Sequence, residues 1–351
     1  MPRKRSSRPA ADFAKAWQKT AVFAKPWQIV RRAAVCFFFA AALLPAAFPR
    51  AAAAQKIGPY PIVFKGTGNN VVTSSVTISR REKNTLWVSF AGSARGEQGI
   101  PVRDIKTIAV PPPAPLAAAG QLLSRPVPSD PAKKDAFTAR LSKTLSELDR
   151  EIRIFTPYRT LPGIPAADLL LAKGRLLLKV SRDTEAVQVF ETLLDFLPPE
   201  DPRALTAQIL AGIAYSRTGN ALQAIEYLSP LAPPADDEAL LSDMFFALGD
   251  AYLALGNADN ALLTYLHLLV FHPFVHHNEP RLLEKVLPCY AAIGDWESLL
   301  RTVRWIQRDY PSTPAAETAR KCLEKYAAQI GEAQTSLSGG GDAGEDDYDD
   351  D

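Results

Sequence analysis

The chain has 351 residues, of which 47% are hydrophobic and 22% are charged, and its formal net charge is +2 at pH 7. This is enough apolar material for one large domain or two small ones with tails. Residues 1–54 hold ten Lys or Arg against the single Asp12, which leaves the remainder with 30 basic and 37 acidic residues. The bulk charge of that remainder excludes a nucleic-acid-binding protein of the usual basic kind.

The first 54 residues have the order of an export signal. Arg31 and Arg32 stand directly before an apolar run, Ala33 to Phe48, and four alanines precede Gln55. This predicts cleavage near residue 54 and a mature chain in the periplasm or cell envelope. An uncleaved membrane anchor is the alternative, although the run contains Pro45 and is shorter than the ~20 residues that span a bilayer. The paired arginines also suit the folded-protein export route, but the residues after them lack its consensus.

Residues 55–113 predict a small β module. Short apolar alternations, separated by charged or Gly-rich turns, indicate an antiparallel sheet of three or four strands that ends at Pro111–Pro113. The segment Lys65–Asn70 is faintly similar to a phosphate-binding loop, but no helix follows it, which favours a simple turn. The apolar positions of the alternations are Val76, Ile78, Leu86, Val88, Phe90, Ile100, Val102, Ile105, Ile108 and Val110.

Residues 114–164 predict linker helices. The stretches Leu116–Ser124 and Pro131–Ile154 are expected to be helical, and the second carries Phe137, Leu141, Leu145 and Leu148 along one face. Together the two stretches suit a divergent helix pair ahead of the repeats.

Between residues 165 and 330 a pattern of small and aromatic residues recurs. Gly174, Gly212 and Gly249 follow one another at intervals of 38 and 37 residues. Small residues at these sites predict two closely approaching helix backbones within each pair, with aromatic side chains between successive pairs. A fourth unit carries Leu287 where the glycine is expected. The third unit has the fullest pattern: Phe245, Leu248, Gly249, Tyr252, Gly256, Ala261, Tyr265 and Pro273.

This pattern resembles that of the tetratricopeptide repeat (TPR) family. The resemblance implies a mainly α fold, a TPR-like α-solenoid of about four to five helix pairs preceded by the small antiparallel β module. A last helix, Pro314–Ile330, is expected to cover the end of the array, and residues 331–351 to form a disordered acidic tail. The order of β module and repeats is also similar to that of bacterial cell-envelope proteins.

The resemblance implies a binding groove lined by the first helix of each pair. The residues expected to line this groove include both apolar and charged side chains, which suits a protein or peptide partner of acidic character. The alternative is that the charges are ordinary solvated surface residues. Carrying the family's inward-facing spacing onto this chain gives Leu171, Arg175, Lys179, Ile213, Arg217, Phe246, Asp250, Leu253, Arg281 and Lys285.

All four histidines lie within eleven residues at the end of the third unit: His267, His272, His276 and His277. Imidazoles at this density could hold a transition metal. Pro273 breaks the helix through which a pair would converge, and this favours a solvated turn over a metal site.

Two cysteines, Cys289 and Cys322, fall on the first helix of the fourth unit and on the covering helix. In an oxidising compartment they could form a disulfide, and the alternative is two separately buried thiols.

The sequence contains no Ser-His-Asp order, paired-carboxylate cleft or Cys-His pair that would indicate catalysis. We therefore expect an exported, non-catalytic protein-binding scaffold that needs no cofactor. The alternatives are a membrane-anchored envelope assembly factor and, less favoured, a metal-binding protein that uses the histidine-rich turn.

Overall fold

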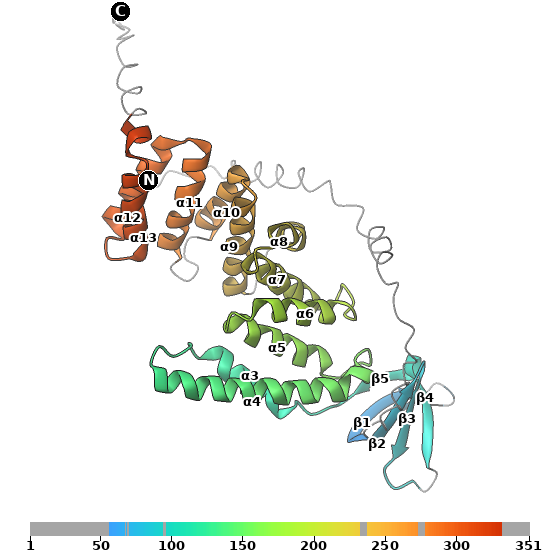
Figure 1. The fold of residues 1–351 in the computed structure, drawn as a ribbon. Coiled ribbons are helices and arrows are strands. Elements are labelled where there is room, and N and C mark those ends of the chain that lie inside the picture. The colour runs from blue at the N-terminus through green and yellow to red at the C-terminus, as the bar shows by residue number, and fades with distance from the viewer. Residues whose placement is uncertain are drawn as a thin grey trace, which may run out of the picture. The chain divides into compact units, whose positions relative to one another are not determined.

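The computed structural model describes residues 56–66, 68, 70–93, 96–231, 237–272 and 278–331. They form a small β-sheet followed by a succession of helices (Figure 1). The predicted export signal, residues 1–54, and all of the predicted acidic tail after Gly331 lie outside the described residues.

The β module contains five strands, one more than the upper number predicted. They are β1 (Ile57–Lys65), β2 (Val71–Glu82), β3 (Thr85–Phe90), β4 (Glu97–Pro101) and β5 (Ile105–Ile108), with the 3-10 turn η2 (Val102–Asp104) before β5. The sheet is antiparallel in the order β4-β3-β2-β1-β5.

The strand that the sequence did not predict is β1. Pro59 and Pro61 argue against a central strand because proline cannot donate to the ladder. The structure accommodates them with a register shift between Ile57 and Tyr60, and β1 pairs with β2 on one side and β5 on the other. The Lys65–Asn70 segment is the connection between β1 and β2, as predicted for a turn, and the Gly66 amide donates to the Asn70 carbonyl at 2.8 Å.

The sheet is fixed to the helices through the turn that precedes the repeats. The amide of Ile108 in β5 donates to the carbonyl of Pro162 at 3.0 Å. Gly163 has φ +86°, and a Cβ on it would lie 2.1 Å from the Ile108 carbonyl oxygen. Only glycine fits both the backbone conformation and this close approach. On the same turn, Thr160 accepts a hydrogen bond from Arg81 of β2 at 2.6 Å.

The helices follow the predicted order, and their bounds lie close to the expected ones. They are α3 (Ala114–Ser124), α4 (Pro131–Phe155), η3 (Thr156–Tyr158), α5 (Ala166–Lys179), α6 (Asp183–Leu194), α7 (Pro202–Arg217), α8 (Ala221–Leu228), α9 (Glu238–Ala254), α10 (Ala258–Phe271), α11 (Glu279–Ile293), α12 (Trp296–Asp309) and α13 (Pro314–Lys325). Helix α13 is interrupted by a turn at Tyr326, and residues 327–331 are helical again, which includes the predicted end at Ile330. None of the helices in the described segments is both long and apolar enough to cross a membrane.

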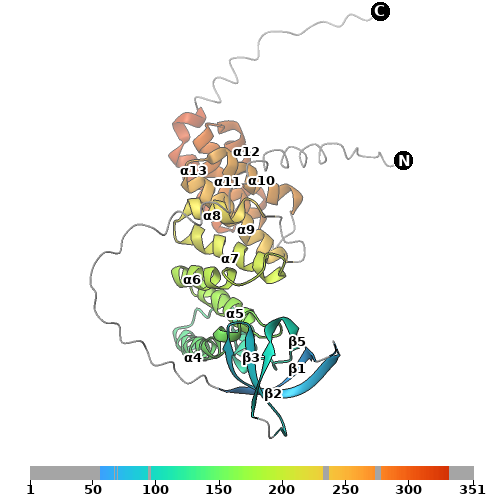
Figure 2. The same ribbon diagram turned by 90° about the vertical axis from the view of Figure 1, so that its right-hand side faces the viewer.

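The helices stack as pairs, which confirms the TPR-like architecture. Four pairs, α5/α6, α7/α8, α9/α10 and α11/α12, follow one another, and the second helix of each packs on the first helix of the next (Figure 2). Helices α3 and α4 pack on each other and on α5, with Lys173 of α5 paired to Asp149 of α4 at 2.7 Å. At the other end, α13 packs on α11 and α12.

The three glycines recur at equivalent places, but their partners differ from the prediction. A Cβ on Gly174 would lie 2.4 Å from the ring of Phe190, and one on Gly249 would lie 2.4 Å from the ring of Tyr265. The large residue therefore fills the space within a pair, directly over the glycine, and not the space between pairs. Gly212 meets Leu228 in the same way at 2.5 Å. In each pair the partner stands 16 residues after the glycine.

The fourth pair reverses this arrangement. Leu287 occupies the glycine position and Val303 stands 16 residues later, and both are buried in one hydrophobic cluster. The bulk has moved from the second helix to the first, so the interior volume can be filled without a glycine.

The two cysteines are free thiols in the structure, Cys289 buried and Cys322 half-buried. Cys289 is buried among the side chains of α9 and α10, whereas Cys322 belongs to the cluster around α12 and α13. Burial raises the pKa of the Cys289 thiol to about 11, which keeps it protonated and unreactive at neutral pH.

Candidate partner-binding face

The predicted groove residues lie on the first helices, but several of them are in the seams between neighbouring helices. Ile213 of α7 and Phe246 of α9 are 3% and 2% exposed, so they present no free surface. The reason is geometric: α7 packs against α5 and α9, and Phe246 of α9 shares a hydrophobic cluster with Leu282 and Val286 of α11, so positions that point along the row are covered by the next helix. Leu171 and Leu253 are half-buried at the edges of the same seams.

Two of the predicted cations cap the preceding first helix. The ammonium of Lys179, the last residue of α5, donates to the carbonyl of Leu123 near the end of α3 at 2.6 Å. Arg217, the last residue of α7, donates to the carbonyl of Leu178 near the end of α5 at 3.3 Å. Carbonyls in the last turn of a helix lack partners within it and favour a positive charge. Lys179 and Arg217 are therefore repeated structural ties, 38 residues apart.

Burial lowers the pKa of the Lys179 ammonium. Arg217 also lies 3.8 Å from the carboxylate of Asp183, at the start of α6. Both cations therefore already make contacts within the chain and are not free surface charges.

The other predicted residues from α9 and α11 come together in one cluster. The Asp250 carboxylate accepts hydrogen bonds from the buried Tyr265 hydroxyl at 2.5 Å and from the Lys285 ammonium at 2.6 Å. Burial and the nearby carboxylate raise the pKa of Tyr265. One turn away, the guanidinium of Arg281 lies 3.9 Å from the centre of the Phe246 ring. We call these five residues the α9/α11 cluster.

Arg281 is the most exposed charged group of the α9/α11 cluster. Within the described residues no carboxylate forms an ion pair with Arg281 or with Arg175 of α5. The buried ring beneath Arg281 restricts its guanidinium, and a positioned guanidinium is suited to bind a carboxylate. The first helices thus retain two cations, on α5 and on α11, that are free to contact a partner.

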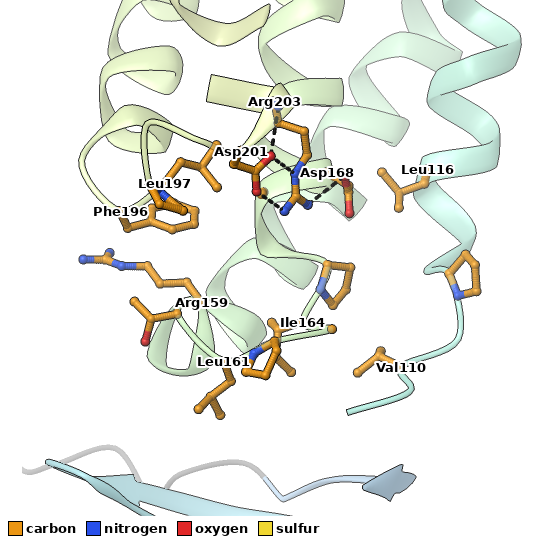
Figure 3. Close-up of a pocket in the computed structure, with 17 residues that line it drawn as sticks. Val110, Leu116, Arg159, Leu161, Ile164, Asp168, Phe196, Leu197, Asp201 and Arg203 are labelled. Carbon is orange, nitrogen blue, oxygen red and sulfur yellow. Dashed lines mark hydrogen bonds and ion pairs between the residues drawn. The ribbon is translucent and has the colours of Figure 1, made fainter. Parts of the chain in front are cut away.

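The structure also contains a cleft that the sequence did not predict, where the turn before α5 meets the turn between α6 and α7 (Figure 3). Its volume is about 510 Å³, within the range of small-ligand sites. Apolar side chains from the β5–α3 connection, α3 and both turns line most of it: Val110, Leu116, Leu161, Ile164, Phe196 and Leu197.

The charges of this cleft are largely satisfied among themselves. The Arg203 guanidinium holds Asp201 through bonds of 2.6 and 2.9 Å and reaches Asp168 at 3.1 Å (Figure 3). Hydrogen bonding to Arg203 lowers the pKa of Asp201. The exposed Arg159 has its guanidinium carbon 5.3 Å from the centre of the Phe196 ring. The cleft is therefore mainly apolar with one cation available at Arg159.

Proline-rich turns were the only sequence signal for the cleft. Each turn by itself marks a helix boundary, and nothing local shows that residues 159–165 and 196–203 meet.

The described segments contain His267 and His272, whereas the predicted turn, residues 273–277, lies outside them and stays a prediction. His267 is half-buried on α10 and stacks on Phe245, with ring centres 4.9 Å apart and an interplanar angle of 12°. Burial, and secondarily the charge of His272, lower the pKa of His267. His276 and His277 lie outside the described residues. Among the residues that are described, no group of three or more His, Cys, Asp or Glu is placed to hold a metal ion.

No protein-family model and no curated protein matches this chain. Among solved structures, it is similar to TPR-like repeats of a protein described as a kinesin light chain from Podosopora anserina. That match has a TM-score of 0.40 and 15% identity and covers 61% of this chain and 96% of the other. A singly substituted form of the same protein matches with a TM-score of 0.40 and 15% identity, covering 63% and 95%. A likeness at this level says nothing about what this chain binds.

Proposed function

We propose that this chain is an exported, non-catalytic scaffold that binds a segment of a partner protein across the first helices of its TPR-like array. The partner carries carboxylates that contact Arg175 and Arg281, and its apolar side chains pack at the half-buried Leu171 and Leu253. The site of action is the periplasm or cell envelope.

One observation carries the proposal: the Arg281 guanidinium is exposed and rests on the buried Phe246 ring. A cation fixed on an aromatic ring loses little side-chain freedom on binding, so its contact with a carboxylate costs less entropy than that of a free arginine. Lys285 beside it is held by Asp250 at 2.6 Å, so its charge is largely neutralised and Arg281 is the cation of this cluster that a partner would contact.

The test is capture of partners from envelope extracts by the wild-type chain and by a chain carrying Arg175→Glu with Arg281→Glu. We expect one partner to be lost while far-UV circular dichroism shows unchanged helicity. Arg217→Glu is unsuitable for this purpose, because Arg217 ties α7 to α5 and its loss would disturb the array.

The matched control is Lys133→Glu with Arg140→Glu, which makes the same change of charge on the exposed side of α4. If the control loses the same partner, bulk charge explains the binding. If the first-helix variant retains every partner, the binding face lies elsewhere.

Export is tested separately by fractionation and sequencing of the mature N-terminus. A mature chain that begins near Gln55 in the periplasmic fraction supports a cleaved signal. An intact N-terminus in the membrane fraction would instead support the membrane-anchored assembly factor, and an intact N-terminus in the cytoplasm would contradict export.

A further inference from the structure

Helix α12 has two opposite faces. The inner face is buried against α11 and α13 through Leu299, Val303 and Ile306. The outer face carries exposed residues spaced three, four and seven apart, which places them in one stripe along the helix. We name this stripe the α12 arginine stripe, and it consists of Arg301, Arg304, Trp305 and Arg308.

The α12 arginine stripe keeps an excess of positive charge. Arg301 pairs with Glu297 at 2.5 Å, and Arg308 pairs with Asp309 at 2.7 Å. Both pairs are exposed and lie within one helix, where ion pairs contribute little, and the stronger of the two is the bidentate contact of Arg308 with Asp309 at 2.7 and 2.8 Å. Arg304 forms no ion pair within the described part of the chain. Three arginines thus face only two carboxylates.

The chain itself supplies a segment of opposite charge. Glu345 to Asp351 contains six carboxylates around Tyr348, and a Gly- and Ser-rich stretch separates this run from the end of the described structure at Gly331. No other seven-residue stretch of the sequence is as acidic.

The described chain ends beside α12, and the residues that follow it are numerous enough to reach the stripe on the outer face of that helix. The ring of Tyr326, just after α13, lies 5.4 Å from the ring of Trp296 at the start of α12. Ile330 is buried in the same cluster as the inner face of α12. Thirteen residues, 332–344, then precede the acidic run. They reach about 45 Å when extended, and their typical end-to-end distance of about 20 Å matches the length of a 14-residue helix, about 21 Å.

We infer that the acidic segment Glu345–Asp351 binds the α12 arginine stripe of the same chain. Its carboxylates pair with the guanidinium groups of Arg301, Arg304 and Arg308, and Tyr348 brings a ring to the exposed Trp305. The short linker gives the acidic segment a local concentration on the order of millimolar, so that individually weak exposed pairs act together. The stripe is then closed to other anionic partners until one of them displaces the segment. This contact is separate from the proposed function, because it uses no first-helix residue.

The experiment measures binding of a fluorescent peptide of residues 338–351 to the full chain by anisotropy at about 50 mM salt, where charge screening is modest. One chain is wild type. The other has a neutralised tail, made by substituting Gln for Glu345 and Asn for Asp346, Asp347, Asp349, Asp350 and Asp351. We expect the peptide to bind the neutralised-tail chain at least ~10-fold more tightly, because the wild-type tail competes for the stripe.

A second set of variants, built on the neutralised-tail chain, locates the site. Arg301→Glu with Arg304→Glu and Arg308→Glu is expected to weaken peptide binding at least ~10-fold at unchanged helicity, with most binding lost at about 0.5 M salt. The matched control reverses the same number of charges on α4 with Lys133→Glu, Lys134→Glu and Arg140→Glu, and should bind as the parent does.

Equal binding to the wild-type and neutralised-tail chains would overturn self-occupancy. Binding that survives reversal of the three stripe arginines would also overturn the inference, whether the peptide has found the basic residues 1–54, Arg175 and Arg281, or another cation. Loss in the α4 control to the same degree would show non-specific attraction only.

Discussion

The second and fourth helix pairs fill the same interior position in opposite ways. In α7/α8 the first helix has Gly212 and the second helix fills the space with Leu228, whereas in α11/α12 the first helix has Leu287 and the second has Val303. At this position the repeat requires a suitable combined volume of the two facing side chains, one from each helix. It does not require a glycine. A pattern search that demands glycine therefore finds the second pair readily and the fourth pair poorly.

The largest expected effect is on stability, for a substitution of Leu287 in the fourth pair. Leu287→Gly removes a buried side chain and adds a flexible residue within a helix, and should lower the free energy of unfolding by about 4 kcal/mol. Val303→Leu in the same chain should recover a substantial part of that loss, because it recreates the glycine–leucine arrangement of the second pair. Urea unfolding followed by circular dichroism measures both. A double variant that loses the sum of the two single effects would show that the pairs are not interchangeable.

The reciprocal change tests the glycine side. Gly212→Leu places a side chain where a Cβ already meets Leu228 at 2.5 Å, and should cost about 3 kcal/mol through overpacking. Adding Leu228→Val should reduce that cost, since the pair then matches Leu287 with Val303. Gly120→Leu on α3 is the control, because a Cβ there meets nothing within 4 Å. Its stability should be equal to or slightly above that of the wild type.

A smaller effect on stability is expected for the helix ends in the first half of the array, and none for the corresponding end in the second half. Lys179 and Arg217 occupy equivalent last positions of α5 and α7, and the equivalent residue of α9 is Ala254. Lys179→Met should lower stability by about 1 kcal/mol, the usual contribution of one capping hydrogen bond. Ala254→Met should leave the urea midpoint unchanged. Equal effects of the two substitutions would remove the distinction between tied and untied helix ends.

The smallest expected effect is on the pH dependence of stability, and it comes from His267 in the third pair. His267 of α10 has a lowered pKa in the folded chain, so below its ordinary value of 6.5 the unfolded chain binds the proton more readily. Stability is therefore fully present above pH 6.5 and decreases as the pH falls below it. Thermal unfolding between pH 7.5 and 5 should show a shallower decrease for His267→Phe than for the wild type. Identical slopes would mean that other groups control the dependence.

The helices and the repeat register followed from the sequence because both depend on local patterns. Gly174, Gly212 and Gly249 each mark a close approach within one helix pair, and Asp201 and Asp237 cap the helices that follow them, with carboxylates accepting amide hydrogens at 2.9 Å. The groove was predicted less well. Spacing along a helix shows which residues share a face, but not how far the next helix extends over that face. The next helix covers Ile213 and Phe246, which are therefore buried.

Contacts between distant segments were the part that sequence patterns could not supply. The bond from Lys179 to the Leu123 carbonyl joins residues 56 positions apart, and no residue type marks a carbonyl as an acceptor. The Arg81 contact to Thr160 is of the same kind across 79 positions. The missed strand β1 has a different cause, since Pro59 and Pro61 obscured an alternation that a register shift restores.

The coverings at the two ends of the helix array set its length. At one end the five-stranded sheet is fastened through Gly163 and Ile108, and α4 turns charged residues outward; at the other, α13 presents Glu317, Arg320 and Lys321 to solvent. Hydrophobic edges of the kind that let repeat units add on are thereby concealed at both limits. The described terminal helices therefore offer little apolar surface on which a further repeat unit could stack.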